Sequence, residues 1–123
     1  MKPPIRVLYA EDNPQDADLA RAHFEQEAPD FALEVVASGE ACLARLRAES
    51  FDLLLLDHHL PDMDGLELLR QLTVEGPRVP VVMVTGVGHD ELVMQALRAG
   101  ACYYVPKSGD HLATLPAILR PIV

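Results

Sequence analysis

Short apolar runs alternate five times with segments of helical periodicity along the chain. Runs that are rich in branched aliphatic residues and bounded by turn residues are typical of buried strands. Strands that alternate with helices indicate βαβ units and a parallel sheet. The predicted strands span residues 5–10, 33–37, 52–56, 80–84 and 102–105.

The segments between these strands place apolar residues three or four positions apart, as one face of a helix requires. In the first segment, Asn13 is a suitable N-cap and Pro14 a suitable first residue, because the N–H that proline lacks is not needed there. Gly100 is a suitable terminator of the fourth. The residues expected to face the core are Ala17, Ala20 and Phe24, then Leu43 and Leu46, then Leu66, Leu69 and Leu72, and finally Leu92, Val93, Ala96 and Leu97.

The fifth helical segment is the least well defined, because it contains Pro116 and ends at Pro121. Proline is tolerated in the first turn of a helix and disrupts its interior, so we expect Pro116 near the first turn. Either this helix is short or the chain was cut inside it. The abrupt apolar finish suggests a domain excised from a longer protein, although a small stand-alone protein is the alternative.

Length and composition indicate one domain, residues 1–123, half of whose residues are hydrophobic. The net charge of −9 argues against a general affinity for nucleic acid or anionic membranes. No run reaches membrane-spanning length, and the first apolar run is too short for a signal peptide. We expect a cytoplasmic protein that binds proteins or small ions, without direct nucleic-acid contact or membrane insertion.

Cysteine and histidine give no metal motif. Cys42 and Cys102 are far apart, and neither has a second cysteine at metal or redox spacing, so we expect two reduced, mostly buried thiols. His58 and His59 are adjacent, and adjacent side chains in an extended segment point to opposite sides. We therefore do not expect this pair to bind one transition-metal ion.

Acidic residues follow two of the predicted strands, and a lysine follows a third. Glu11 and Asp12 come after the first strand, Asp57 after the third and Lys107 after the last. In open α/β sheets the carboxyl ends of the strands form the edge where ligands bind. Neighbouring acids raise one another's pKa unless a cation compensates them, and Mg²⁺ prefers such oxygen ligands. The sequence therefore predicts a site for Mg²⁺ and a phosphoryl group.

Four segments, in this order, resemble the receiver domain of two-component response regulators. They are residues 7–14 (VLYAEDNP), 57–65 (DHHLPDMDG), 84–86 (VTG) and 100–107 (GACYYVPK). The resemblance covers nearly the whole chain. It implies an α/β fold of the flavodoxin-like kind, with a five-stranded parallel sheet of order 2-1-3-4-5 and helices on both faces.

The resemblance also implies the roles of the acids and the lysine. Asp57 matches the phosphoacceptor, Glu11 and Asp12 match the acidic pair that holds Mg²⁺ or Mn²⁺, and Lys107 matches the family's lysine. Independently of the family, a carboxylate can attack phosphorus to form an acyl phosphate. Because phosphoryl transfer depends on positioning and charge stabilisation, Mg²⁺ and Lys107 would supply the positive charge.

A second group of residues matches the family's switch and its modulators. Thr85 matches the switch hydroxyl and Tyr104 the switch aromatic, which together would change a protein-binding face. The backbone carbonyl of His59 would join the metal site. The side chains of His59 and Val87 would flank the path of attacking water and, with Gly86 beside them, modulate the lifetime of the acyl phosphate.

The sequence departs from the family pattern beside the lysine. Ser108 stands where most receivers have a proline that follows a cis peptide bond. A cis bond before serine would cost about 2.5–4 kcal/mol, so we expect a trans bond and a rerouted loop. Tyr103 stands where the family often has Asp or Asn.

The leading hypothesis is a Mg²⁺-dependent phosphoacceptor that is not a turnover enzyme. Its expected partners are a sensor histidine kinase or histidine phosphotransfer protein and a downstream effector, and a homodimer stays open. The altered loop at Ser108 keeps a second hypothesis, a receiver-like module that docks without phosphorylation. A hydrolase of the haloacid-dehalogenase kind is disfavoured, because such enzymes usually have an aspartate where this chain has His59. A nucleotide site is disfavoured because Gly86-Val87-Gly88 is not a full phosphate loop.

Overall fold

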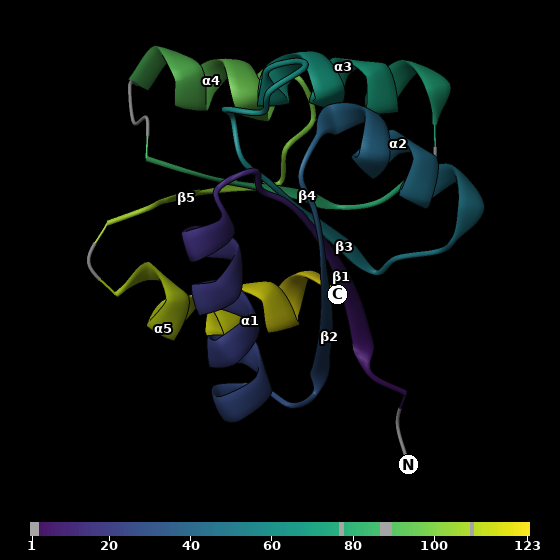
Figure 1. The fold of residues 1–123 in the computed structure, drawn as a ribbon. Helices are drawn as coiled ribbons and strands as arrows, with labels where there is room; N and C mark the ends of the chain where they lie inside the picture. Colours follow the sequence, from purple (N-terminus) through teal and green to yellow (C-terminus); the bar gives the residue numbers. More distant parts are fainter. Residues whose placement is uncertain (1–2, 77, 87–89, 109) are drawn as a thin grey trace.

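The computed structural model describes residues 3–76, 78–86, 90–108 and 110–123. In this part of the chain, five strands form one parallel sheet of order β2-β1-β3-β4-β5 (Figure 1). The strands are β1 (Ile5–Ala10), β2 (Phe31–Val36), β3 (Leu53–Leu56), β4 (Val81–Thr85) and β5 (Tyr103–Pro106). The helices are α1 (Pro14–Glu27), α2 (Gly39–Ala48), α3 (Gly65–Glu75), α4 (Asp90–Arg98) and α5 (His111–Leu119), followed by the 3₁₀ helix η1 (Arg120–Ile122). The predicted fold class and strand order are confirmed.

The sheet has a hydrophobic core on each face. Helices α2, α3 and α4 cover one face and α1 and α5 cover the other (Figure 1). Successive strand residues point to alternate faces, so Leu54 and Leu56 pack under the first group of helices and Leu53 and Leu55 under the second. All four leucines of β3 are fully buried, because both faces are covered. This double burial explains the continuous apolar runs in the sequence.

Side chains from the loops fix where the helices begin. The Asn13 side chain caps α1, since its Oδ1 accepts hydrogen bonds from the N–H groups of Gln15 (2.9 Å) and Asp16 (3.2 Å). Asp64 caps α3 by accepting a bond of 2.8 Å from the N–H of Glu67. After α4, Gly100 has a φ of 115°, a conformation that favours glycine, as the sequence predicted.

Three predictions about packing are wrong. Leu97 is 45% exposed, because the buried face of α4 is narrow and is filled by Leu92 and Ala96. Pro116 lies inside α5 and not in its first turn. Its ring is buried in the core at this interior position. Cys102 is exposed, because it precedes β5, which lies at the edge of the sheet. Helix α5 is short, with nine residues, which agrees with one of the two alternatives that the sequence left open.

None of the helices within the described residues combines the length and the apolar character that crossing a lipid bilayer requires.

Candidate functional site

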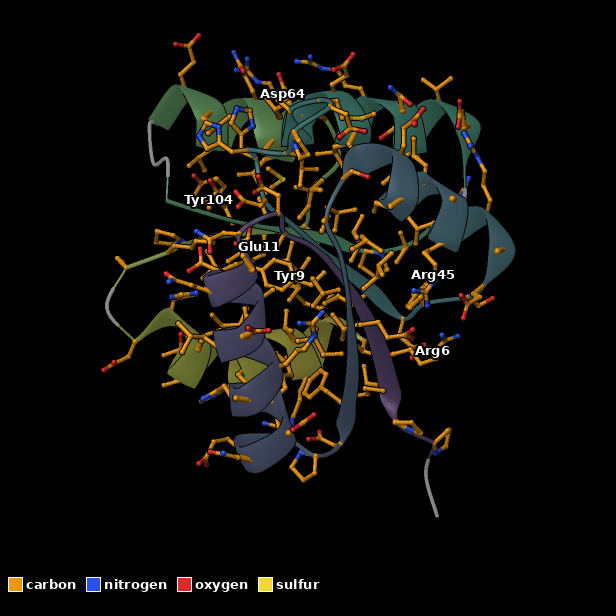
Figure 2. The ribbon with its side chains drawn as sticks, viewed as in Figure 1. Arg6, Tyr9, Glu11, Arg45, Asp64 and Tyr104 are labelled. Atoms are coloured by element: carbon orange, nitrogen blue, oxygen red, sulfur yellow. The ribbon has the colours of Figure 1, made fainter. Side chains whose placement is uncertain are left out.

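The strand register brings the predicted site residues to one end of the sheet. Ala10 at the end of β1 pairs with Leu56 at the end of β3, and the N–H of Asp57 donates to the Ala10 carbonyl at 3.1 Å. Glu11 and Asp57, the residues that follow, are therefore neighbours. Figure 2 shows Glu11 where β1 ends and α1 begins. The predicted gathering of acids at this edge is confirmed.

Three carboxylates form a cluster that can hold a metal ion. Glu11, Asp12 and Asp57 each offer one oxygen, and these oxygens lie within 4.8 Å of one another. Glu11 and Asp57 are buried, whereas Asp12 is exposed. Glu11 Oε2 is buried and has no hydrogen-bond partner among the described residues. A set of carboxylate oxygens with one buried oxygen unsatisfied fits a hard divalent cation such as Mg²⁺.

Lys107 joins two of these acids to a third element. Its Nζ donates to Asp57 Oδ2 at 3.0 Å, to Asp16 Oδ2 at 3.0 Å and to Glu11 Oε1. An ammonium group has three N–H donors, so these three bonds use all of them. The lysine lies here because its backbone N–H donates to the carbonyl of Thr85 at 2.9 Å, which continues the pairing of β5 with β4.

The same site shifts the pKa values of its two buried acids in opposite directions. Burial, and then the neighbouring Asp57 carboxyl group, raise the pKa of Glu11 to about 8, although Lys107 acts in the opposite direction. Burial alone would raise the pKa of Asp57, but its hydrogen bonds with Glu11 and Lys107 outweigh burial and hold that pKa below its usual value. Compared with exposed acids of the same type, Glu11 therefore holds its proton more strongly and Asp57 holds its proton less strongly.

Lys107 stays charged in the same surroundings. Burial alone would lower its pKa, but the bond with Glu11 and the other negative groups around it outweigh burial and raise the pKa above its usual value. The site thus presents an ionised carboxylate in direct contact with a permanent cation. This pairing is suited to a carboxylate nucleophile and an anionic substrate group.

The predicted switch residues lie on the two strands beside the cluster. Thr85 is the last residue of β4 and is fully buried, and Gly86 after it is exposed. Tyr104 pairs with Met83 in the register of β4 with β5 and is partly buried. Burial, followed by the charge of Asp57, raises the pKa of Tyr104, so the field of Asp57 reaches this ring. Figure 2 shows the Tyr104 ring toward the same end of the sheet as Glu11.

The loop after Asp57 begins with His58 and His59. The backbone N–H of His59 donates to Asp57 Oδ1 at 3.3 Å, and the His59 side chain is exposed. The expectation that His58 and His59 point to opposite sides is wrong, because the chain bends at His58 and the two ring centroids are 5.1 Å apart.

The described residues contain no cis peptide bond, so the bond before Ser108 is trans, as predicted. Val87 lies outside the described residues.

Sequence reasoning missed two acids near the site. Asp16 on α1 binds Lys107, as described above. Asp62 in the loop between β3 and α3 accepts the N–H groups of Gly39 (2.8 Å) and Glu40 (2.9 Å), which ties this loop to the start of α2. The sequence signal for Asp16 was its place in the first helical turn after Asp12. Acids are common in first turns for helix-dipole reasons, so this signal did not distinguish it.

The chain is similar to known proteins over most of its length. A family model described as the response regulator receiver domain matches residues 7–119. The transcriptional regulatory protein TctD of Salmonella typhimurium is 34% identical over 119 residues, which cover 97% of this chain and 52% of TctD. The chain thus spans about half of TctD, and as little as 17% of other curated relatives.

Two solved structures have the same fold; one has Mn²⁺ bound and the other is phosphorylated. The Mn²⁺-bound form of the response regulator Rcp1 superposes with a TM-score of 0.81 at 26% identity, covering 94% of this chain and 92% of that one. The phosphorylated cyanobacterial phytochrome response regulator RcpA superposes with a TM-score of 0.79 at 26% identity, covering 97% of this chain and 91% of that one.

Proposed function

Because this chain belongs to the family of response regulator receiver domains, we propose that Asp57 accepts a phosphoryl group from a phosphohistidine in a two-component pathway. The donor is a sensor histidine kinase or a histidine phosphotransfer protein. One observation carries the proposal, namely the contact of 3.0 Å between the ionised Asp57 carboxylate and the Lys107 ammonium inside a cluster of acids.

The metal of this site would be Mg²⁺ or Mn²⁺. Glu11, Asp12 and Asp57 would hold it, with the backbone carbonyl of His59 as a further ligand. The oxygen donor set and the unsatisfied Glu11 oxygen support this assignment. The Mn²⁺-bound form of Rcp1 supports it from a similar fold. When bound, the ion supplies positive charge that stabilises the oxygens of a transferring phosphoryl group.

The chain's own groups carry out the transfer. An Asp57 oxygen attacks phosphorus, the bond between phosphorus and the donor histidine nitrogen breaks, and that nitrogen keeps the electron pair. Lys107 donates a hydrogen bond to an oxygen of the transferring group, as its contact with Asp57 allows. The product is an acyl phosphate on Asp57, so the domain is modified itself and does not turn over a substrate.

The signal leaves through the face that contains Tyr104. The Thr85 hydroxyl follows the new phosphoryl oxygen, and Tyr104 then moves toward the space near Thr85. The place of Thr85 at the end of β4 and the partial burial of Tyr104 support this step. The partner on this face is a downstream effector protein or domain, in keeping with relatives that are transcriptional regulators about twice as long.

Phosphorylation by a small donor tests the proposal. We expect the protein to gain the mass of one phosphoryl group when it is incubated with acetyl phosphate and MgCl₂, and to lose this gain in EDTA. Asp57→Asn should abolish the gain. Asp18→Asn is the matched control, because Asp18 is an exposed acid of α1 that pairs with Arg21 and does not contact the site.

Each other outcome has a clear meaning. A parent protein that gains no mass while both variants stay folded favours the alternative of a module that docks without phosphorylation. A mass gain that persists in Asp57→Asn would place the phosphoacceptor elsewhere. Steady release of phosphate from monoester substrates would contradict the proposal that the domain is not a turnover enzyme.

A further inference from the structure

Lys107 has one partner that lies outside the metal cluster. Of the three carboxylates that its ammonium binds, Glu11 and Asp57 belong to the cluster that can hold a cation, and Asp16 does not. Asp16 Oδ2 is 3.0 Å from Nζ, the same distance as Asp57 Oδ2. The ammonium therefore lies between the phosphoacceptor and the first turn of α1.

The backbone holds Asp16 firmly in this place. It is the third residue of α1, and its N–H donates to the Asn13 cap at 3.2 Å. Its side chain is 40% exposed, whereas that of Lys107 is 14% exposed, so the ion pair lies at the border of the buried site. A charged hydrogen bond in such partly buried surroundings is stronger and more directional than one on an open surface.

We propose that Asp16 is a positioning residue for phosphoryl transfer, which holds the Lys107 ammonium beside Asp57 while the other two partners of Lys107 change. This inference rests on the proposed function. A bound cation would engage oxygens of Glu11 and Asp57, and phosphorylation would change the Asp57 carboxylate itself. The bond to Asp16 is outside both events, so it keeps Nζ within reach of the transferring group throughout.

The expected effect is on the rate of transfer more than on metal binding. With acetyl phosphate, an Asp57 oxygen forms the new bond to phosphorus, and acetate leaves with the electron pair of the broken bond. The ammonium must be near phosphorus at that moment, and an ammonium that loses one of its three bonds samples other positions. We expect Asp16→Asn to lower the rate of phosphorylation about tenfold, with Mg²⁺ affinity changed by no more than about twofold.

The test measures initial phosphorylation rates by intact mass with acetyl phosphate, and Mg²⁺ affinity by titration calorimetry. The matched control is Asp18→Asn, which removes the same charge from the same helix without touching Lys107 and should keep the parent's rate. Asp16→Glu, which keeps the charge, should recover part of the rate. In a Lys107→Met background, Asp16→Asn should cause no further loss, because the lysine it positions is gone.

Several results would overturn this role. They are a parent rate in Asp16→Asn, an equal loss in Asp18→Asn, an undiminished loss in the Lys107→Met background, or a large loss of Mg²⁺ affinity in Asp16→Asn. Each of these is observed in a parent protein that is phosphorylated on Asp57, so the proposed function stands. A parent that is never phosphorylated removes the proposed function and this inference together.

Discussion

At the scale of single residues, burial decides the chemistry of side chains of the same type. Cys42 on α2 is fully buried in the core under α2, α3 and α4, and burial raises the pKa of its thiol to about 12. Cys102 is exposed, and its thiol donates a weak hydrogen bond to the Val81 carbonyl at 3.3 Å. The two thiols therefore differ in how their protonation is coupled to folding.

The buried thiol gives the protein an alkaline limit of stability. The folded pKa of Cys42 is about 12 and its ordinary value is 9.0, so the folded state retains a proton that the unfolded state loses. The contribution of the protonated Cys42 thiol to the free energy of unfolding is complete below pH 9 and declines as the pH rises from 9 toward 12. At a pH of about 10.5 the loss is about 2 kcal/mol. Urea unfolding of the parent and of Cys42→Ala at a pH of about 7.5 and about 10.5 measures it.

We expect the parent to lose about 2 kcal/mol more than Cys42→Ala between these two pH values. Cys102→Ala is the control and should follow the parent much more closely, because the thiol of Cys102 is less buried. Parallel losses in the parent and in Cys42→Ala would show that another group sets the alkaline limit.

The sequence predicted the main site residues but not the state in which they lie. Glu11, Asp12, Asp57 and Lys107 could be placed together because strand ends meet at one edge of a parallel sheet. The raised pKa of Glu11 could not be predicted, since it depends on how deeply each acid is buried. The contact between Asp16 and Lys107 could not be predicted either, because it depends on the angle at which α1 leaves β1.

At the scale of elements, the loop from β3 to α3 is fixed at several points. The N–H of Gly65 donates to the His58 carbonyl at 2.7 Å, and Asp62 caps the start of α2. Met63 packs against Gly39 on α2. The loop that begins with Asp57 is thereby attached to α2 and α3, so its shape is determined by both helices.

Gly65 is the point at which the neighbouring atoms can yield least, because they belong to the backbone. A Cβ added there would lie 2.7 Å from the Asp57 carbonyl oxygen and 2.9 Å from the His58 Cα, which are backbone atoms that cannot move alone. We expect Gly65→Ala to lower the free energy of unfolding by about 1–3 kcal/mol. It should also slow phosphorylation by acetyl phosphate, because the backbone of Asp57 must shift. Urea unfolding and intact mass measure the two effects.

Gly76, which follows α3, provides the comparison for Gly65. A Cβ there meets no atom within 4 Å, so Gly76→Ala should leave the free energy of unfolding within about 0.5 kcal/mol of the parent's and the phosphorylation rate unchanged. Equal behaviour of the two variants would mean that the close contacts at Gly65 do not constrain the loop.

Elements were predicted best where burial leaves a simple pattern. The run of leucines in β3 has one explanation, a strand covered on both faces, and β3 (Leu53–Leu56) lies within the predicted residues 52–56. The errors at Leu97 and Pro116 concern helices at the margin of the core. There the periodicity of the sequence does not say how wide the buried face is or whether packing can outweigh the preference of proline.

At the scale of the whole molecule, charge is balanced at one end of the sheet and not at the other. At the start of β1, Arg6 pairs with Glu34 (2.9 Å) and Glu49 (2.8 Å), and Arg45 pairs with the same two acids. Figure 2 shows Arg6 and Arg45 at the end of β1 opposite Glu11. At the Glu11 end, the described residues place one cation, Lys107, against Glu11, Asp57 and Asp16, and Asp12 adds a fourth acid to the cluster.

This imbalance predicts that a divalent cation stabilises the whole fold. A ligand that binds the folded state alone adds about 2.7 kcal/mol when its free concentration is about a hundred times its Kd. We expect Mg²⁺ to raise the free energy of unfolding of the parent accordingly, as measured by urea unfolding in MgCl₂ and in EDTA. Asp12→Asn removes one exposed ligand and should weaken Mg²⁺ affinity by at least about tenfold.

The same variant should be more stable than the parent in EDTA, because it removes one of three mutually repelling acids, so the order of stability reverses when Mg²⁺ is added. Glu27→Gln changes the charge equally at the far end of α1, and it should keep the full gain from Mg²⁺. If Asp12→Asn gains as much from Mg²⁺ as the parent does, the cation stabilises this protein by screening its net charge of −9 and not by binding the cluster.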